Sequence, residues 1–253
     1  MRALKTPLRF PGDNVAYASK IASHFPKRIR TVCSPFFTGG SVEIQLVNKG
    51  TNVYGYSYFT LLVEFWQCLL RDPNRLYKII NHFYPIEEER MFYHMQDTIS
   101  NHEDIFLRSA IFYICNRSTE CGNITHGKFA TKNSNFNDLS MLQLTSFRTN
   151  RLHVKNCLKY TDAISENVVN YLFCAPPKYR PESLLMMPVA QEQLNINHVE
   201  LRSILAKRNN WLLLYNFHPK LLKLYDGCSY KMMDKNFRVC DDATDAKNII
   251  FTN

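Results

Sequence analysis

The sequence predicts an α/β fold, because short apolar runs alternate with amphipathic stretches at both ends of the chain. This alternation is typical of parallel strands that are joined and covered by helices. The 253 residues, 45% of them hydrophobic, can bury a core without disulfides or a metal. We therefore expect one domain with an inserted subdomain. The expected strands are residues 30–33, 52–55, 168–174 and 211–215, with a closing pair near 230–234 and 248–252.

The middle of the chain follows a different pattern. From residue 65 to residue 152 the apolar residues have helical spacing, as in FLRSAIFYICNR, and the strand–helix alternation is missing. We expect residues 1–64 and 161–253 to form the two parts of the core, and residues 65–160 to form a helical insert. Within this insert, residues 120–137 are polar, and ITHGKF predicts a hairpin tip with Gly127 at the turn. A Pro-rich loop is expected over residues 178–195.

The balance of charge favours a polyanionic partner. Lys and Arg outnumber Asp and Glu by 31 to 22, which gives a formal net charge of +9. DNA, RNA or an acidic protein face would each be attracted to such a surface, although a merely basic protein is the alternative. The cations Arg148, Arg151, Lys155 and Lys159 follow one another closely and predict either a phosphate track or a solvated face.

Cysteine and histidine usage argues against metal binding and secretion. The eight cysteines are scattered, with no CxxC pair and no Cys/His cluster at zinc spacing, so they are interpreted as reduced thiols. The histidines, including His24, His82, His153 and His198, show no ligand spacing. The N-terminal MRALKTPLRF has no apolar core, and no apolar run approaches the length of a membrane span. We expect an intracellular protein of the cytoplasm, nucleus or virion, without metal and without membrane insertion.

Four segments occur in an order and at a spacing that resemble the Dam-type (D12 class) DNA adenine-N6 methyltransferases, including the shorter phage members. They are PLRFPGDN, SPFFTGGSVEI, GYSYFTLLVEFW and FCAPPKY. The resemblance continues through NRSTECGN, HGKFAT, WLLLYN, LYDG and NIIFTN, and so covers nearly the whole chain. It implies a Rossmann-like, S-adenosylmethionine-dependent methyltransferase fold: a seven-stranded, mostly parallel sheet that ends in an antiparallel pair, with a target-recognition-like insert.

The resemblance also shows where polar residues of the cofactor site have changed. The family's first segment ends in Gly-Gly-Lys, whose Lys helps to hold the cofactor, and this chain has Asp13 and Asn14 there. Ser34 replaces an acidic residue and Thr38 a common glycine of the glycine-rich turn, although other glycines remain. Ser57 replaces the carboxylate that accepts both ribose hydroxyls. The vestigial cofactor positions are Asn14, Phe37, Gly39, Gly40 and Ser57.

The fourth segment has lost the residues that act on the target base. Family members carry Asp-Pro-Pro-Tyr, and this chain carries Ala175, Pro176, Pro177 and Lys178. The resemblance implies that the Asp and a proline carbonyl orient the target amino group while the Tyr stacks on the flipped adenine. Alanine accepts no hydrogen bond, and lysine would place a positive charge near a cationic sulfonium. No catalytic residue and no cofactor are therefore expected.

Several residues of the insert are candidates for contact with nucleic acid. The predicted hairpin, with Asn123, Thr125, His126 and Lys128, resembles the family's recognition hairpin, but a surface turn or a protein contact is the alternative. Arg117, beside Asn116, would either touch phosphate or fasten the hairpin to the insert. The candidate set is Arg117, Asn123, Thr125, Lys128, Arg148 and Arg151. Lys178, Tyr179 and Arg180 suggest an anion site or an ordinary solvated loop.

These observations predict a catalytically inactive methyltransferase-like protein. It would serve as a structural or scaffolding component of a larger assembly, viral or nucleoprotein, with protein partners, or as a nucleic-acid-binding module. The alternative is an active, site-specific DNA N6-adenine methyltransferase with an atypical APPK motif. In that case S-adenosylmethionine would bind, and the Pro176 carbonyl alone would orient the amine.

Overall fold

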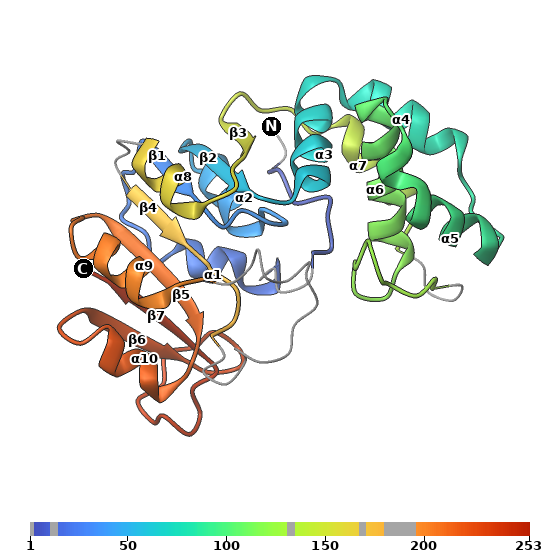
Figure 1. The fold of residues 1–253 in the computed structure, drawn as a ribbon. Coiled ribbons are helices and arrows are strands. Elements are labelled where there is room, and N and C mark those ends of the chain that lie inside the picture. Colours follow the sequence, from blue (N-terminus) through green and yellow to red (C-terminus); the bar gives the residue numbers. More distant parts are fainter. Residues whose placement is uncertain (1–2, 11–14, 131–134, 167–170, 180–195) are drawn as a thin grey trace.

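A single sheet organises the protein. The computed structural model describes residues 3–10, 15–130, 135–166, 171–179 and 196–253. In this described part the sheet has seven strands in the order β3-β2-β1-β4-β5-β7-β6 (Figure 1). The strands are β1 Thr31–Ser34, β2 Asn52–Ser57, β3 Leu152–Asn156, β4 Tyr171–Cys174, β5 Trp211–Asn216, β6 Ser229–Met233 and β7 Asn248–Thr252. Neighbouring strands from β3 to β5 run parallel, and β7 pairs antiparallel with both β5 and β6. The predicted α/β methyltransferase fold is confirmed.

Burial explains why the central strands form where they do. Every residue of β4 (YLFC) is buried, and so are the first five of β5 (WLLLYN). Continuous apolar runs of this kind are typical of parallel strands that are covered on both faces. Each face has its own apolar cluster: Val32, Val53 and Phe173 lie in one, and Cys33 and Leu213 lie in the other.

Helices cover both faces of the sheet (Figure 1). The short η1 (Val15–Tyr17) and α1 (Ala18–Ala22), followed by α2 (Ser41–Asn48), contribute to the first cluster. The helices α8 (Tyr160–Glu166), α9 (His198–Leu205) and α10 (Pro219–Leu224) contribute to the second. Each helix points an apolar stripe at the sheet, as the sequence pattern predicts.

The remaining helices form a lobe beside the sheet, which we call the helical insert (Figure 1). It consists of α3 (Thr60–Arg71), α4 (Pro73–His82), α5 (Glu89–Thr98), η2 (Ile99–Asn101), α6 (Ile105–Ser118) and α7 (Asp138–Thr145). Ten of the fourteen residues of α6 are buried, so this helix is the centre of the lobe. Arg108 of α6 forms an ion pair with Glu64 of α3, whose Phe65 ring stacks parallel to that of Tyr113. The insert and the first face of the sheet share one apolar cluster.

Two local predictions differ from the structure. The sequence placed residues 152–156 within the insert, but they form β3, which pairs with β2 from Val53↔Leu152 to Ser57↔Asn156. Only two of its residues are buried, so its apolar signal is weak. The predicted hairpin over residues 120–137 is, in its described part, a loop closed by one bridge, Thr119↔Phe129. Residues 131–134 of that prediction, 168–170 of a predicted strand and 180–195 of the Pro-rich loop lie outside the described residues.

Two further findings concern the described residues as a whole. None of the described helices combines the length and the apolar character that crossing a bilayer requires. Within the same residues, His, Cys, Asp and Glu side chains do not gather in threes as metal ligands would.

Candidate functional site

The sequence-predicted site residues converge where the strand order reverses. From β1 the chain builds outward through β2 to β3, and it then returns to the other side of β1 with β4. In open α/β sheets, ligands bind at the carboxyl ends of the strands at such a switch point. Ser34 is the last residue of β1, Ser57 is the last residue of β2, and Ala175 directly follows β4. Three of the predicted positions therefore lie along the same edge of the sheet.

The glycine-rich turn after β1 is intact and packs against an aromatic ring. Gly40 has φ +73°, a left-handed conformation that favours glycine, and it directly precedes α2. A Cβ atom on Gly40 would lie 2.9 Å from Phe37 Cζ, and one on Gly55 would lie 2.5 Å from Phe37 Cδ2. The Phe37 ring thus lies in the core between two glycines, edge-on to Trp66 at 5.6 Å. Its side chain shapes the turn from below, whereas the sequence had placed Phe37 among the cofactor positions.

A buried carboxylate lies at the end of β1. Glu43, in the first turn of α2, accepts a hydrogen bond at 2.7 Å from Ser34 Oγ. The two residues are 5% and 1% exposed. Sequence reasoning singled out Ser34 for its missing acid and overlooked Glu43, because a glutamate in SVEIQLV resembles an ordinary polar position of an amphipathic helix. The contact shows that an acidic group is present at this position after all.

Ser57, at the end of β2, offers only a hydroxyl. Its side chain is buried, and its Oγ accepts a hydrogen bond from Phe59 N at 3.3 Å. The Ser57 carbonyl accepts a second bond, from Cys157 N at 3.0 Å. These contacts stabilise the turn into α3, and they leave one neutral group where a diol would need two strong acceptors.

The fourth segment follows β4 and its aromatic residue is held elsewhere. Pro176 is buried and Lys178 is exposed. Tyr179 N donates to Asn216 Oδ1 at 2.7 Å, and Asn216 Nδ2 donates back to Tyr179 O at 3.2 Å. The Tyr179 ring lies 4.8 Å from the His198 ring and 5.2 Å from the His218 ring. Tyr179 is therefore bound to β5 and to the segments around it, and does not replace the aromatic residue missing at position 178.

A search with family models matches residues 10–182 to the D12 class N6 adenine-specific DNA methyltransferases. The chain belongs to this family. The match includes the glycine-rich turn, the helical insert and the APPK segment, and it ends just beyond Tyr179. A search of curated proteins found no match for the chain.

The cofactor of the D12 class, S-adenosylmethionine, carries an ammonium group, a sulfonium and a ribose diol. The Glu43 carboxylate suits the ammonium group, since opposite charges form the stronger hydrogen bonds. Ser57 does not suit the diol, and the ammonium of Lys178 has the same charge as the sulfonium. The described residues thus fit one end of this cofactor and not the rest.

The Asn-Arg pair at the end of α6 fastens two D12 segments together. Asn116 Oδ1 accepts from Arg9 N at 2.9 Å, and Asn116 Nδ2 donates to the carbonyls of Arg9 and Gly122. Arg117 donates to the carbonyls of Asn135 and Pro7, at 3.0 and 3.3 Å. Burial lowers the pKa of Arg117. These contacts favour the fastening role over the phosphate contact among the two alternatives.

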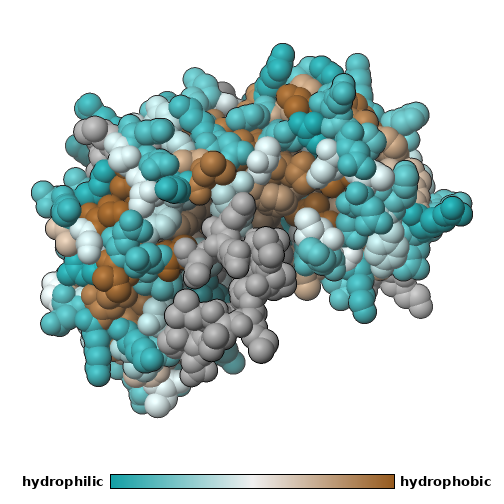
Figure 2. Space-filling view, viewed as in Figure 1, coloured by the Kyte–Doolittle hydropathy of each residue, from teal (hydrophilic) through white to brown (hydrophobic). Residues whose placement is uncertain are grey.

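The other candidate nucleic-acid residues form two separate groups. Asn123, Thr125 and Lys128 are exposed on the loop after α6, where Asn123 Oδ1 accepts from the backbone of Thr125 and His126. Arg148 lies at the opposite end of α6, since its guanidinium contacts Asn74 beside the Arg75–Asp104 ion pair. The length of α6 separates the two groups by about 20 Å. On the face seen in Figure 2, hydrophilic side chains cover much of the insert.

The second group continues along the sheet edge. Arg151 is exposed just before β3 and donates to the Gly50 carbonyl at 3.0 Å. Lys155 is exposed on β3, and Lys159 is exposed after it. The predicted track of Arg148, Arg151, Lys155 and Lys159 therefore follows the edge strand of the sheet.

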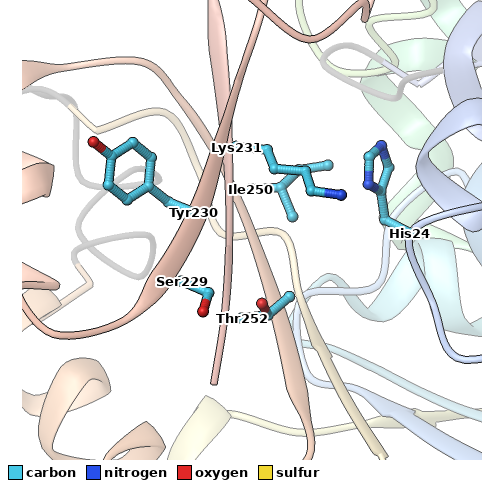
Figure 3. Close-up of a pocket in the computed structure, with 6 residues that line it drawn as sticks. All are labelled: His24, Ser229, Tyr230, Lys231, Ile250 and Thr252. Atoms are coloured by element: carbon cyan, nitrogen blue, oxygen red, sulfur yellow. The ribbon is translucent and has the colours of Figure 1, made fainter. Parts of the chain in front are cut away.

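A separate hollow lies at the other end of the sheet. It is lined by His24, Ser229, Tyr230, Lys231, Ile250 and Thr252. His24 and Lys231 extend toward one another, and Tyr230 points to the opposite side of the strand (Figure 3). Thr252 pairs with Leu212 near the amino end of β5, so the hollow is remote from the carboxyl ends of the parallel strands.

Proposed function

We propose that this D12 family member does not methylate adenine and serves as a nucleic-acid-binding or structural component of a larger assembly. The observation that carries the proposal is Ala175 at the end of β4, at the switch point of the sheet. Its methyl side chain accepts no hydrogen bond, so it cannot orient the lone pair of an amino group toward a methyl donor. Losing one such contact typically costs about a hundredfold or more in rate.

The rest of the site supports the same conclusion. Lys178 is exposed, and Tyr179 is bound through Asn216 and lies between two histidine rings. A flipped adenine would therefore lack an aromatic platform from either residue. Ser57 weakens the grip on a ribose diol, which removes a second requirement independently of the first. We accordingly propose that S-adenosylmethionine is not a working cofactor of this protein.

The proposed binding to nucleic acid is supported by charge. The chain carries a net charge of +9, and Lys128, Arg148, Arg151, Lys155 and Lys159 are exposed. Exposed cations of this kind bind phosphates without reading sequence. The track along β3 is the better candidate, because consecutive cations there lie close along an extended edge. An acidic protein face is the other partner that this charge would attract.

Two assays test the proposal. Purified protein is incubated with methyl-labelled S-adenosylmethionine and adenine-containing duplex DNA, beside an active D12 enzyme as the positive control. We expect no transfer by this protein. Binding to the same duplex is measured over a range of salt concentrations, and a steep loss of affinity with salt would indicate phosphate contacts. Absence of DNA binding would favour a protein partner, whereas methyl transfer would show an active enzyme in which the Pro176 carbonyl orients the amine.

A further inference from the structure

The Glu43 carboxylate lies at the position in the sheet where a small ligand is expected. It is attached to Ser34, the final residue of β1, and the strand order reverses between β1 and β4. Ligand-binding crevices of open α/β sheets form beside this point. The glycine-rich turn that leads from Ser34 to α2 allows a ligand to approach the backbone closely, because Gly40 has no side chain.

The burial of this carboxylate is itself informative. An ionised carboxylate is strongly disfavoured in an apolar environment unless charge or hydrogen bonds compensate it. Glu43 is 5% exposed, and its sequence neighbours Val42 and Ile44 belong to the apolar core. A carboxylate has about four lone-pair sites, so it can accept from Ser34 and also from a bound cation. Ser34 fixes the direction of the carboxylate by donating to one of its oxygens.

We propose that Glu43 is the anionic group of this site and binds the ammonium of a ligand that carries an amino-acid moiety. The acid that the family places on β1 is supplied here from α2, with its oxygen 2.7 Å from the hydroxyl that replaced it. Ser34 is the positioning residue. The ligand class follows from the charge: a carboxylate at a solvent-poor position selects a protonated amine over a neutral group. This inference concerns binding only, and it stands whether or not methyl transfer occurs.

The test compares two ligands that differ in the amino-acid moiety. The full chain is titrated calorimetrically with S-adenosylhomocysteine and with 5′-methylthioadenosine, which shares the adenosine and lacks the ammonium. We expect S-adenosylhomocysteine to bind at least about tenfold more tightly, the effect of one hydrogen bond to a charged group. Glu43→Gln should remove this preference while leaving the affinity for 5′-methylthioadenosine unchanged. Glu89→Gln, a change of the same kind at an exposed position of α5, should leave both affinities unchanged.

A double variant guards against a folding defect. Ser34→Asp combined with Glu43→Gln returns the acid to β1 and should restore the preference that Glu43→Gln abolishes. Equal affinity for both ligands in the unmodified protein, or no binding of S-adenosylhomocysteine at millimolar concentration, would overturn the proposal. So would a Glu43→Gln variant that keeps the full preference. These outcomes are independent of the methyl-transfer assay, so a failure here is distinguishable from a failure of the proposed function.

Discussion

Tyr179 and Asn216 hold each other through two reciprocal hydrogen bonds, from Tyr179 N to Asn216 Oδ1 and from Asn216 Nδ2 to Tyr179 O. This pair joins the loop after β4 to the last residue of β5. It fixes the Tyr179 ring against His198 and His218, and so keeps the nearest aromatic side chain out of the role that position 178 has lost.

We expect Asn216→Ala to destabilise the protein through this pair. The change removes two hydrogen bonds and should lower the free energy of unfolding by about 1–3 kcal/mol. For a chain of 253 residues this corresponds to a fall of a few degrees in the midpoint of thermal unfolding. Circular dichroism melts would measure it. Asn236→Ala, in the turn after β6, serves as the comparison, and an equal effect of the two changes would contradict the importance of the pair.

The N-terminal segment predicts a second stability effect, at Gly122. This residue has φ +73°, and a Cβ atom there would lie 1.5 Å from the Arg9 carbonyl oxygen. Gly122→Ala should therefore cost more than the roughly 1–2 kcal/mol of the left-handed conformation alone. Gly227 is a matched control, because it has φ +80° with no heavy atom within 4 Å of its Cβ position. If chemical denaturation showed equal losses for both variants, the contact between Gly122 and Arg9 would be unimportant.

A third prediction concerns the catalytic segment. We expect the double variant Ala175→Asp, Lys178→Tyr to remain inactive in the labelled methyl-transfer assay. It restores the groups that act on the base, but Ser57 still provides no carboxylate for the ribose. Adding Ser57→Asp should give the larger gain in cofactor binding. Robust methylation by the double variant alone would show that Ser57 suffices for the ribose.

The hollow at the amino end of β5 predicts a pH effect. Burial, and then the neighbouring Lys231 charge, lower the pKa of His24, and burial lowers the pKa of His198. Both histidines take up protons more readily when unfolded, so the protein should lose stability as the pH falls below about 6.5. Lys231→Met should raise the pKa of His24 in an NMR titration. Lys223→Met, on α10, is the control, and an unchanged His24 pKa in Lys231→Met would exclude the coupling.

Apolar patterning was sufficient to predict most of the fold. The run NIIFT predicted β7 to the residue, and WLLLY predicted all but the last residue of β5, because buried strands leave uninterrupted apolar segments. The edge strand β3 was missed, since LHVKN buries only Leu152 and Val154. The predicted hairpin failed because Asn123 uses its side chain to bond the backbone in place of a ladder.

The site was predictable where one position carried the information. Ala175, Lys178 and Ser57 could be identified from motif order alone, and they lie at or beside the carboxyl ends of the parallel strands. Glu43 could not, because its significance comes from contact with Ser34, nine residues earlier in the sequence. The role of Arg117 likewise depended on a carbonyl partner, Pro7, at the far end of the chain.

The most direct test of the central claim is methyl transfer by the unmodified protein. Duplex DNA that contains adenine in varied sequence contexts is incubated with labelled S-adenosylmethionine, and the digested nucleosides are examined for N6-methyladenine. The loss of the acid at Ala175 predicts no product above the level without protein, under conditions in which an active D12 enzyme methylates the same DNA. N6-methyladenine that increases with the amount of this protein, and that Pro176→Ala leaves unchanged as a structural control, would contradict the account.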